Sequence, residues 1–324
     1  MCSSCKPLYE RESCPDVCQP MTDVAQVRLS FRPTTLSDIA SLRPMLACSP
    51  YRTCDFTVGG LFMWVDYFRY SHCVYDGTLF VRGVSEDDMR VPAFSLPMGA
   101  LPLQCSIGLL REYCEANGVP LVLSAVPEPV VDSLMKLGAK SAVELTDWAD
   151  YLYEASPMAT FSGKKLSKKR NHVNHFMAEN PDHTFEPLDS GNVAEVIEFF
   201  ENQHLTADKS LSADYERLQV LDVLRHMDVY GFEGEVLKTS GHGIVAFTLG
   251  ETVGDTLYVH IEKMDHEVSG SGETISSHYV GTMKSRYPGI MYVNREEDTG
   301  DEGLRQAKLA YHPVALLRKY NVHM

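Results

Sequence analysis

The most distinctive charge pattern of this sequence lies at residues 163–176, GKKLSKKRNHVNHF. The stretch holds five positive charges, and no Asp or Glu occurs between Glu154 and Glu179, although the formal net charge of the chain is −15. Such a concentration of positive charge in an acidic protein indicates a place where an anion is bound. A solvated helix face is the alternative interpretation. The candidate anion-binding residues are Lys165, Lys168, Lys169, Arg170 and His172.

The spacing of the same stretch predicts a helix. Its apolar arc consists of Leu166, Val173, Phe176 and Met177. Lys169 projects inside this arc and Arg170 lies at its margin, so we expect both charges to point toward protein or a cleft. Because burying an unpaired charge is costly, each needs a carboxylate or phosphate partner. A structural salt bridge would meet the same need without any ligand.

A second set of chemically versatile residues occupies 293–313, VNREEDTGDEGLRQAKLAYHP. It begins where a predicted strand ends, and ligands of α/β sheets are usually held at that edge. The candidate catalytic residues are Glu296, Asp298 and Tyr311, and the candidate binding residues are Asn294, Arg295, Arg305 and Lys308. A clustered set of Arg, Glu, Asp and Lys can clamp an ammonium group and a phosphate together, and Arg305 and Lys308, three apart on a predicted helix, share one face. A capping network at the helix start would use similar residues.

Two weaker patterns lie between these stretches. In SGSGE (269–273), Gly270 and Gly272 precede a predicted helix and could present backbone N–H groups to a phosphate. An ordinary turn is the alternative. On the preceding strand, His260 and Glu262 alternate with apolar residues and are expected to share one face. A general base is one interpretation of His260, and a hydrogen-bonded strand histidine is the other.

The composition restricts the class of protein. A chain of 324 residues with 44% hydrophobic and 23% charged residues is typical of a globular protein with two domains. The pI near 5.2 argues against a general nucleic-acid coat protein, and no run of residues is long and apolar enough for a transmembrane segment. Nine cysteines at irregular spacing and the lack of a secretion signal favour a reducing cytoplasm.

The N-terminal residues 1–26 are expected to form a flexible leader. Four of its cysteines form the only candidate metal site, a weak zinc set at Cys2, Cys5, Cys14 and Cys18. Two close pairs suit tetrahedral zinc, but the separation between the pairs is short for a zinc ribbon.

The remaining chain predicts two α/β domains, at 27–155 and 156–324. The first shows a helix that starts near Thr35, a hairpin that turns at Asp76-Gly77 and a helix that ends at Asn117-Gly118. The second opens with the basic helix at 163–178 and continues through an antiparallel meander at 230–262. Both halves run through hairpins, a helix, a strand and another helix, which suggests two copies of one architecture.

Several separated motifs resemble one known family. GKKLSKKRNHVNHF, YVHIEKMDHEVSGSGE and YVNREEDTGDEGLRQAKLAYHPV, with CDFTVGGLFMWVDYF and FSLPMGA earlier, are similar to the soluble C-terminal domain of phosphatidylglycerol lysyltransferases and their stand-alone relatives. The resemblance covers roughly residues 27–324. It implies two tandem GNAT-type acyltransferase folds, each a mixed, largely antiparallel sheet flanked by helices, related to the Fem-type aminoacyltransferases.

The resemblance also implies an activity, the transfer of an aminoacyl group from aminoacyl-tRNA to a lipid, a cell-wall precursor or a small amine or hydroxyl acceptor. Two departures are evident: no membrane-spanning portion is present, and Glu267 stands where GNAT enzymes that bind acyl-CoA carry Arg or Gln before Gly-x-Gly. Aminoacyl-tRNA is therefore the expected donor and partner. The alternatives are an acyl-CoA-dependent N-acyltransferase and a non-catalytic anion- or RNA-binding module of the same fold.

Overall fold

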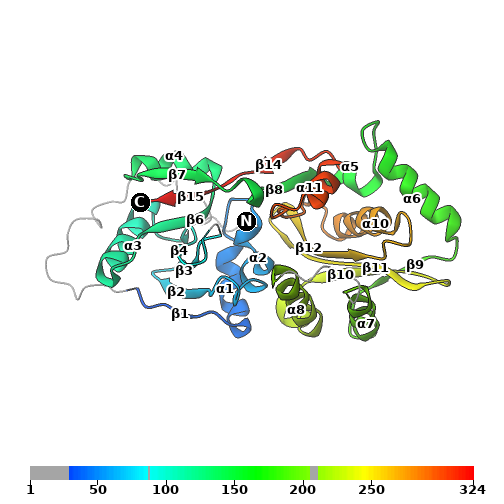
Figure 1. Ribbon diagram of the computed structural model, residues 1–324, viewed down its shortest axis with the longest axis horizontal. Coiled ribbons are helices and arrows are strands. Elements are labelled where there is room, and N and C mark those ends of the chain that lie inside the picture. Colours follow the sequence, from blue (N-terminus) through cyan, green and yellow to red (C-terminus); the bar gives the residue numbers. More distant parts are fainter. Residues whose placement is uncertain (1–28, 87, 205–210) are drawn as a thin grey trace. The chain divides into compact units, whose positions relative to one another are not determined.

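The computed structural model describes residues 29–86, 88–204 and 211–324, so the cysteines of the candidate zinc set lie outside the described residues. The chain forms two compact units, one from Met1–Ala149 with Leu317–Met324 and one from Asp150–Leu316. Each unit contains one mixed sheet with helices on both faces (Figure 1).

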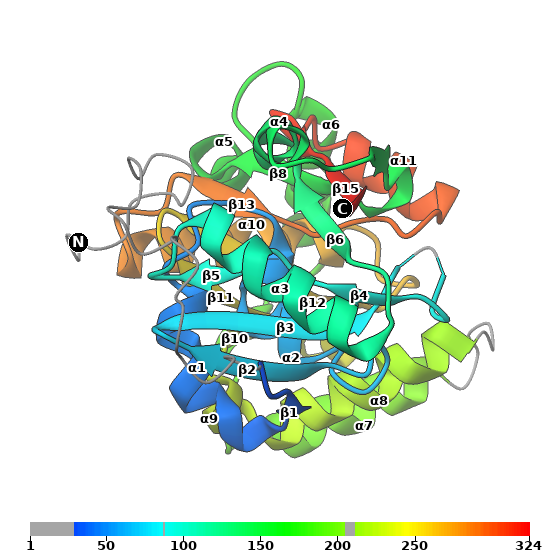
Figure 2. The same ribbon diagram turned by 90° about the vertical axis from the view of Figure 1, so that its left-hand side faces the viewer.

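The first unit holds an eight-stranded sheet in the order β1-β2-β3-β4-β6-β15-β7, with β5 paired to β3. In Figure 2, α3 lies across the front of this sheet, and α1 and α2 lie behind it. The strands are β1 (Arg32–Pro33), β2 (Ser71–Tyr75), β3 (Thr78–Val84), β4 (Pro92–Phe94), β5 (Met98–Gly99), β6 (Val122–Pro127), β7 (Ser141–Glu144) and β15 (Lys319–His323). The helices are α1 (Ile39–Leu46), α2 (Val58–Phe62), α3 (Leu103–Asn117) and α4 (Glu128–Lys136), with 3-10 turns at Leu36–Asp38, Cys54–Phe56 and Thr146–Trp148.

Local sequence signals of the first unit have the expected structures. The β2–β3 hairpin turns at Asp76 and Gly77 with φ of 45° and 65°, the conformation that favours Asp-Gly. Helix α3 ends at Gly118 in the left-handed conformation, where a glycine carries no Cβ penalty. The first helical turn starts after Thr35, whose backbone N–H donates to the Asp38 carboxylate at 2.9 Å.

The second unit holds a seven-stranded sheet in the order β14-β8-β13-β12-β11-β10-β9. Helices α5, α10 and α11 lie on one face of this sheet, and α7 and α8 lie on the other (Figure 1). The strands are β8 (Asp150–Glu154), β9 (Thr184–Pro187), β10 (Glu233–Thr239), β11 (Gly243–Val253), β12 (Thr256–Met264), β13 (Tyr292–Asn294) and β14 (Ala315–Leu317). The helices are α5 (Ala155–Thr160), α6 (Ser167–Glu179), α7 (Val193–His204), α8 (Leu211–Arg225), α9 (Met227–Tyr230), α10 (Ser271–Arg286) and α11 (Glu302–Leu309).

The two sheets share one plan. Each contains a parallel pair, β4 with β6 and β12 with β13, beside antiparallel pairs such as β2 with β3 and β11 with β12. In the first sheet β15 lies between β6 and β7, whereas in the second β8 lies between β13 and β14. β8, which follows β7 in the chain, thus belongs to the second sheet, and β15, which follows β14, belongs to the first. The unit boundary at Ala149 and Leu317 therefore differs from the expected division at residue 155.

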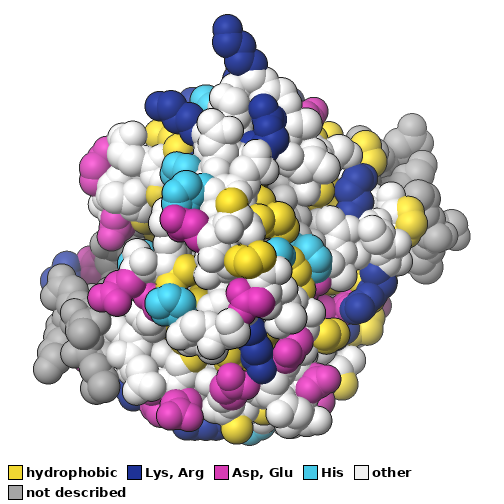
Figure 3. Space-filling model, turned by 90° about the vertical axis from the view of Figure 1, so that its right-hand side faces the viewer, with side chains coloured by type: hydrophobic (Ala, Val, Ile, Leu, Met, Phe, Trp, Pro, Cys, Tyr) yellow, Lys and Arg dark blue, Asp and Glu magenta, His cyan; other side chains and the backbone are white. Residues whose placement is uncertain are grey.

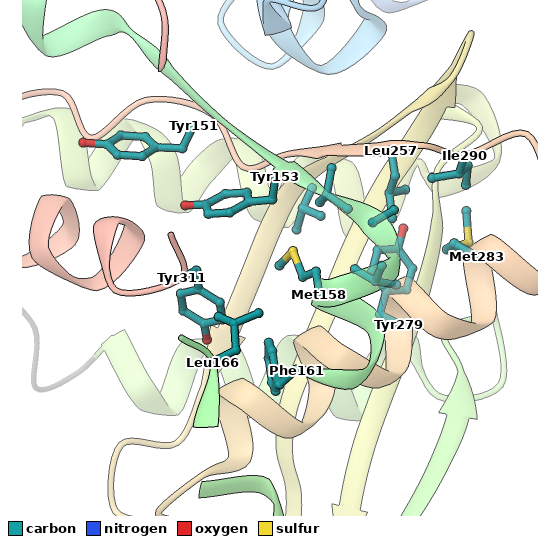
Figure 4. Close-up of a cluster of buried hydrophobic side chains, with 14 residues drawn as sticks. Tyr151, Tyr153, Met158, Phe161, Leu166, Leu257, Tyr279, Met283, Ile290 and Tyr311 are labelled. Carbon is teal, nitrogen blue, oxygen red and sulfur yellow. The ribbon is translucent and has the colours of Figure 1, made fainter. Parts of the chain in front are cut away.

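A buried cluster between α5, α10 and the second sheet forms the core beside the candidate site (Figure 4). It includes Tyr153, Phe161, Leu257, Tyr279 and Tyr311. Tyr311 comes from the segment after α11, and its ring lies 5.7 Å from that of Phe161 between centroids. The hydroxyl of Tyr153 donates to the Lys308 carbonyl at 2.9 Å, which ties β8 to α11. This core fixes the position of Tyr311, around which the charged residues gather.

Candidate functional site

A bulge in β12 determines which way the site residues face. Leu249 of β11 pairs with Ile261, but the next residue, Gly250, pairs with Val259, so His260 is an extra residue in its strand. The alternation of side chains resets after the bulge: Glu262 faces the α10 side, where its carboxylate meets Arg295, while Lys263 reaches Glu216 of α8. The expectation that His260 and Glu262 share one face was wrong, because the extra residue adds half a period to the pleat.

Arg295 and Tyr311 form the centre of the site. The Arg295 guanidinium lies 4.6 Å from the Tyr311 ring centroid, and the Lys169 ammonium lies 4.0 Å from the same centroid. Arg295 donates to Glu262 at 2.6 Å, and Lys169 donates to Glu273 at 3.1 Å. We call Lys169, Glu262, Glu273, Arg295 and Tyr311 the tyrosine cluster. Its charged side chains are between 8% and 16% exposed, so their ion pairs are little weakened by solvent.

The electrostatics of the tyrosine cluster follow from its pairing. Burial acts to raise the pKa of Glu273, but the Lys169 ion pair and its hydrogen bond outweigh burial and leave that pKa below its ordinary value. Burial acts to lower the pKa of Arg295, and the Glu262 carboxylate more than reverses this. Burial also raises the pKa of the Tyr311 hydroxyl, which therefore stays protonated at neutral pH.

The Glu262–Arg295 pair is only half satisfied. One carboxylate oxygen of Glu262, Oε2, and one guanidinium nitrogen of Arg295, Nη1, are buried and have no hydrogen-bond partner among the described residues. Most buried polar atoms do have such a partner, and an unmet one is a reason to look for a ligand. The two atoms are one unused acceptor and one unused donor of the pair.

The segment after β13 holds the remaining predicted residues. Asp298 accepts from Arg305 at 2.7 and 3.0 Å and from the Tyr151 hydroxyl at 2.5 Å. Burial acts to raise the pKa of Asp298, but these donors outweigh it and lower that pKa. Lys308 donates to the carbonyls of Arg295 and Glu297 at 2.6 and 2.5 Å, and burial lowers its pKa. Arg305 and Lys308 thus act on one segment, as their shared helix face predicts, but as clamps within the protein.

Glu296 and Asn294 are also engaged inside the unit. The Glu296 carboxylate lies 2.6 Å from Nδ1 of His260, and its backbone N–H donates to the Asn294 side chain at 2.6 Å. Asn294 in turn donates to Asp150 at 2.7 Å. Glu296 and Asp298 therefore have internal cationic partners, and Glu262 rather than either of them is the carboxylate that pairs with Arg295.

The basic helix divides into two groups of cations. Lys169 projects into the tyrosine cluster as expected, and Arg170 donates to the Phe161 carbonyl at 2.6 Å, so both turn toward protein. Lys164, Lys165 and Lys168 are exposed, and no partner for their ammonium groups occurs in the described ranges. Lys164 and Lys165 precede α6, and Met177, expected on its apolar arc, is 40% exposed. On the face of the molecule drawn in Figure 3, Lys and Arg side chains lie at the top and mainly acidic side chains lie lower down.

The glycine-rich turn is explained by packing. Gly270 caps α10 with φ of 81°, and a Cβ there would lie 2.5 Å from the His172 carbonyl oxygen. A Cβ on Gly272 would lie 2.8 Å from the Met264 sulfur. His172 itself, 55% exposed, lies 3.1 Å from Glu273. Both glycines therefore permit α6 and β12 to approach α10, and the turn is filled by protein.

Sequence reasoning did not identify three contributors to the site. The pattern SGSGE gives no partner for Glu273, the alternation in β12 places Glu262 on the same face as His260, and no motif includes Tyr151. The charge count offered a signal for Glu273, because Lys169 needed a carboxylate that no nearby residue of its helix supplies.

Comparison with known proteins shows the relationship of the chain. A family described as "Phosphatidylglycerol lysyltransferase, C-terminal" matches residues 47–323. A conserved protein of unknown function from Bacteroides thetaiotaomicron VPI-5482 has a crystal structure with a TM-score of 0.84 and 28% identity, covering 91% of this chain and 99% of that chain.

More distant structures share the fold. L-PGS from Bacillus licheniformis has a TM-score of 0.62 at 14% identity, covering 93% of this chain and 94% of that chain. FemX has a TM-score of 0.56 at 10% identity, covering 91% and 98%. The chain thus shares one fold with L-PGS and FemX over most of its length, in agreement with the relationship to Fem-type proteins that the sequence resemblance implies. An uncharacterized protein of Mycoplasmoides gallisepticum is 22% identical over 176 residues; the match covers 53% of this chain and about half of that protein, 55%.

Among the helices of the described residues, none has the length and apolar character needed to cross a lipid bilayer.

Proposed function

The chain belongs to the phosphatidylglycerol lysyltransferase C-terminal family, and we propose that it transfers an aminoacyl group from aminoacyl-tRNA to a hydroxyl or amine acceptor. The observation that carries this proposal is the half-satisfied Glu262–Arg295 pair. An α-aminoacyl ester has an ammonium group and a carbonyl two bonds apart. The ammonium would donate to the free oxygen of Glu262, and the carbonyl oxygen would accept from Nη1 of Arg295.

The same atoms would support the chemical step. When the acceptor attacks the ester carbonyl, a C–O or C–N bond forms and negative charge develops on the carbonyl oxygen. A guanidinium fixed by Glu262 and Tyr311 is a preorganised donor for that charge. The ester bond then breaks, and the 3′-oxygen of the tRNA leaves with the proton that the acceptor loses. Positioning of an already activated ester needs no covalent enzyme intermediate.

The exposed lysines of the basic stretch would contact the phosphates of the donor. Lys164, Lys165 and Lys168 have free ammonium groups at the start of α6, the helix that also carries Lys169 into the tyrosine cluster. Contact with phosphate releases counterions, so the KM for aminoacyl-tRNA should rise with salt. This assigns phosphate binding to the exposed residues and not to Arg170, which is held by backbone carbonyls.

An acyl-CoA donor is the second candidate, and two observations weigh against it. An acetyl group has no ammonium, so the buried oxygen of Glu262 would stay without a partner. The turn before α10 is packed against His172 and Met264, which leaves no open glycine cradle for a pyrophosphate. The proposal therefore keeps aminoacyl-tRNA as the donor.

The test is transfer of radiolabel from mixed aminoacyl-tRNA into the lipid and small-molecule fractions, with wild type compared to Glu262→Gln. The amide keeps the size of the side chain but loses the charge that binds the ammonium, so kcat/KM should fall about 30- to 100-fold. Glu267→Gln is the matched control, because Glu267 is an exposed glutamate of the same segment. Transfer from acetyl-CoA by wild type, with none from aminoacyl-tRNA, would refute the proposal.

A further inference from the structure

His260 is buried between two carboxylates. Its side chain is 0% exposed, with Nε2 3.0 Å from Glu251 and Nδ1 2.6 Å from Glu296. The bulge in β12 turns the imidazole into this position, and the rings of Phe232 and Tyr258 stack with it at 4.9 and 6.3 Å between centroids. Neither ring nitrogen is left for a substrate.

The geometry identifies the protonation state. A neutral imidazole has one N–H and one lone pair, so it can donate to one carboxylate only; contact with two ionised carboxylates requires an N–H on both nitrogens. Burial acts to lower the pKa of His260, but the hydrogen bonds to Glu251 and Glu296 outweigh it and raise the pKa to about 10. His260 is therefore an imidazolium at neutral pH and has no lone pair with which to act as a general base.

The carboxylate that His260 holds belongs to a tightly clamped segment. Glu296 has φ of 56°, an unfavourable value for a residue with a side chain, so surrounding contacts must hold it. The carbonyl of Glu296 accepts from the Tyr151 backbone at 3.1 Å, and Lys308 binds the carbonyl on each side. The residue before this strained position is Arg295, and the direction of its side chain depends on the same backbone.

We propose that His260 is a permanently charged positioning residue, which holds Glu296 and through it places the Arg295 guanidinium over Tyr311. The inference rests on the proposed function only in that Arg295 is the group positioned for transfer; the charge of His260 and the geometry it imposes exist without any substrate. It excludes the general-base role that a histidine in a transferase suggests. The groups that face the imidazole are Glu251 from β11, Glu296 from the segment after β13 and the Tyr258 hydroxyphenyl ring from β12 itself.

The first measurement uses the free protein, labelled with ¹⁵N in histidine and arginine. In wild type both ring nitrogens of His260 should show N–H signals up to about pH 9. In Glu251→Gln the imidazolium loses one carboxylate, and its titration should move down by about one to two pH units. The His260 signals are identified by their loss in His260→Gln or, where that protein does not fold, by their selective shift in Glu251→Gln. A neutral imidazole at pH 8 in wild type, or an unmoved titration in the variant, overturns the proposal.

The second measurement reports on Arg295. In wild type the ion pair with Glu262 should slow the rotation of the Arg295 guanidinium, so its N–H groups should give separate signals. In Glu296→Ala, which truncates a side chain that is 22% exposed, the rotation should be faster and these signals should average. Glu267→Ala, of an exposed glutamate, should leave them unchanged. Unchanged Arg295 signals in Glu296→Ala would refute positioning even where the imidazolium is confirmed.

Transfer kinetics separate this proposal from the proposed function. Where wild type transfers aminoacyl groups, Glu251→Gln should lose kcat on going from pH 7 to pH 8.5 about 1.3- to 4-fold more than wild type, with KM little changed, because a fraction of His260 becomes neutral. His266→Gln, of an exposed histidine two residues after β12, should match wild type. Where no transfer is found, the proposed function fails, and the two NMR measurements still decide the state of His260 and its effect on Arg295.

Discussion

Glu86 in the first unit holds its proton to a higher pH than an ordinary glutamate, because its pKa is raised. Its carboxyl contacts the Ser124 hydroxyl, which also contacts the Asn321 side-chain oxygen, while the Asn321 amide donates to Ser85 at 2.8 Å. The Ser124 hydroxyl donates to the Glu86 carboxyl, which favours its ionised form. Burial, and to a smaller extent the Asp55 charge, raise the pKa of Glu86 to about 7 against the lowering effect of Ser124.

This residue predicts a pH dependence of stability. The folded-state pKa lies above the unfolded value of 4.5, so the stabilisation from Glu86 is complete below pH 4.5 and is lost as the pH rises through about 7. Because the carboxyl is half-buried, we expect the free energy of unfolding to fall by about 1–3 kcal/mol as the pH rises through the Glu86 titration. In Glu86→Gln, urea unfolding at pH 5 and pH 8 should lack this loss, whereas Glu112→Gln, of an exposed glutamate, should retain it. Equal pH dependence in all three proteins would contradict the assignment.

At the scale of elements, α6 meets the start of α10 at Gly270. The Cβ of Gly270→Ala would lie 2.5 Å from the His172 carbonyl oxygen, at a left-handed φ of 81°. We expect a destabilisation of roughly 2–4 kcal/mol, because both the clash and the backbone strain oppose folding. Gly281→Ala in the middle of α10 is the control: nothing lies within 4 Å of its Cβ, so the helix should gain about 0.5–1 kcal/mol. Urea midpoints that move in the same direction for both variants would refute the packing role.

The elements also show where sequence reasoning ends. Turns and caps were predictable because their causes are local: Asp76-Gly77 and Gly118 need particular backbone conformations that few residues adopt. The charge of Lys169 inside an apolar arc predicted a carboxylate or phosphate partner, and Glu273 supplies the carboxylate of the alternative interpretation, a structural salt bridge. The bulge at His260 was not predictable, since no residue type marks it and its cause is the pairing with β11. That single extra residue decides which carboxylate reaches Arg295.

For the whole molecule, the exchange of β8 and β15 between the sheets has no local signal. A strand is predicted from its own residues, but its sheet is chosen by partners far away in the sequence. In the first sheet β15 pairs with both β6 and β7, and buried Lys319 lies 3.0 Å from Asp55. The C-terminal residues are therefore required by a unit whose other residues end at Ala149.

This arrangement predicts the behaviour of fragments. Residues 29–149 lack β15, so β7 has no neighbour and Asp55 loses Lys319; this fragment should show no cooperative unfolding transition. Residues 150–316 keep all seven strands of the second sheet apart from Leu317 and should unfold cooperatively. The midpoint of each urea transition, followed by circular dichroism, is the measurement.

A rescue makes the fragment test specific. β15 is antiparallel to β7, and the Leu145 backbone donates to the Lys319 carbonyl at 2.8 Å, so the end of β7 adjoins the start of β15. Joining residues 29–149 to 317–324 through a short Gly/Ser linker would therefore create a hairpin and should restore a cooperative transition. The same fusion with Lys319→Ala and Asn321→Ala should remain unfolded, because the buried partners of Asp55 and Ser85 are gone. Folding of residues 29–149 without any strand added would show that the unit does not depend on β15.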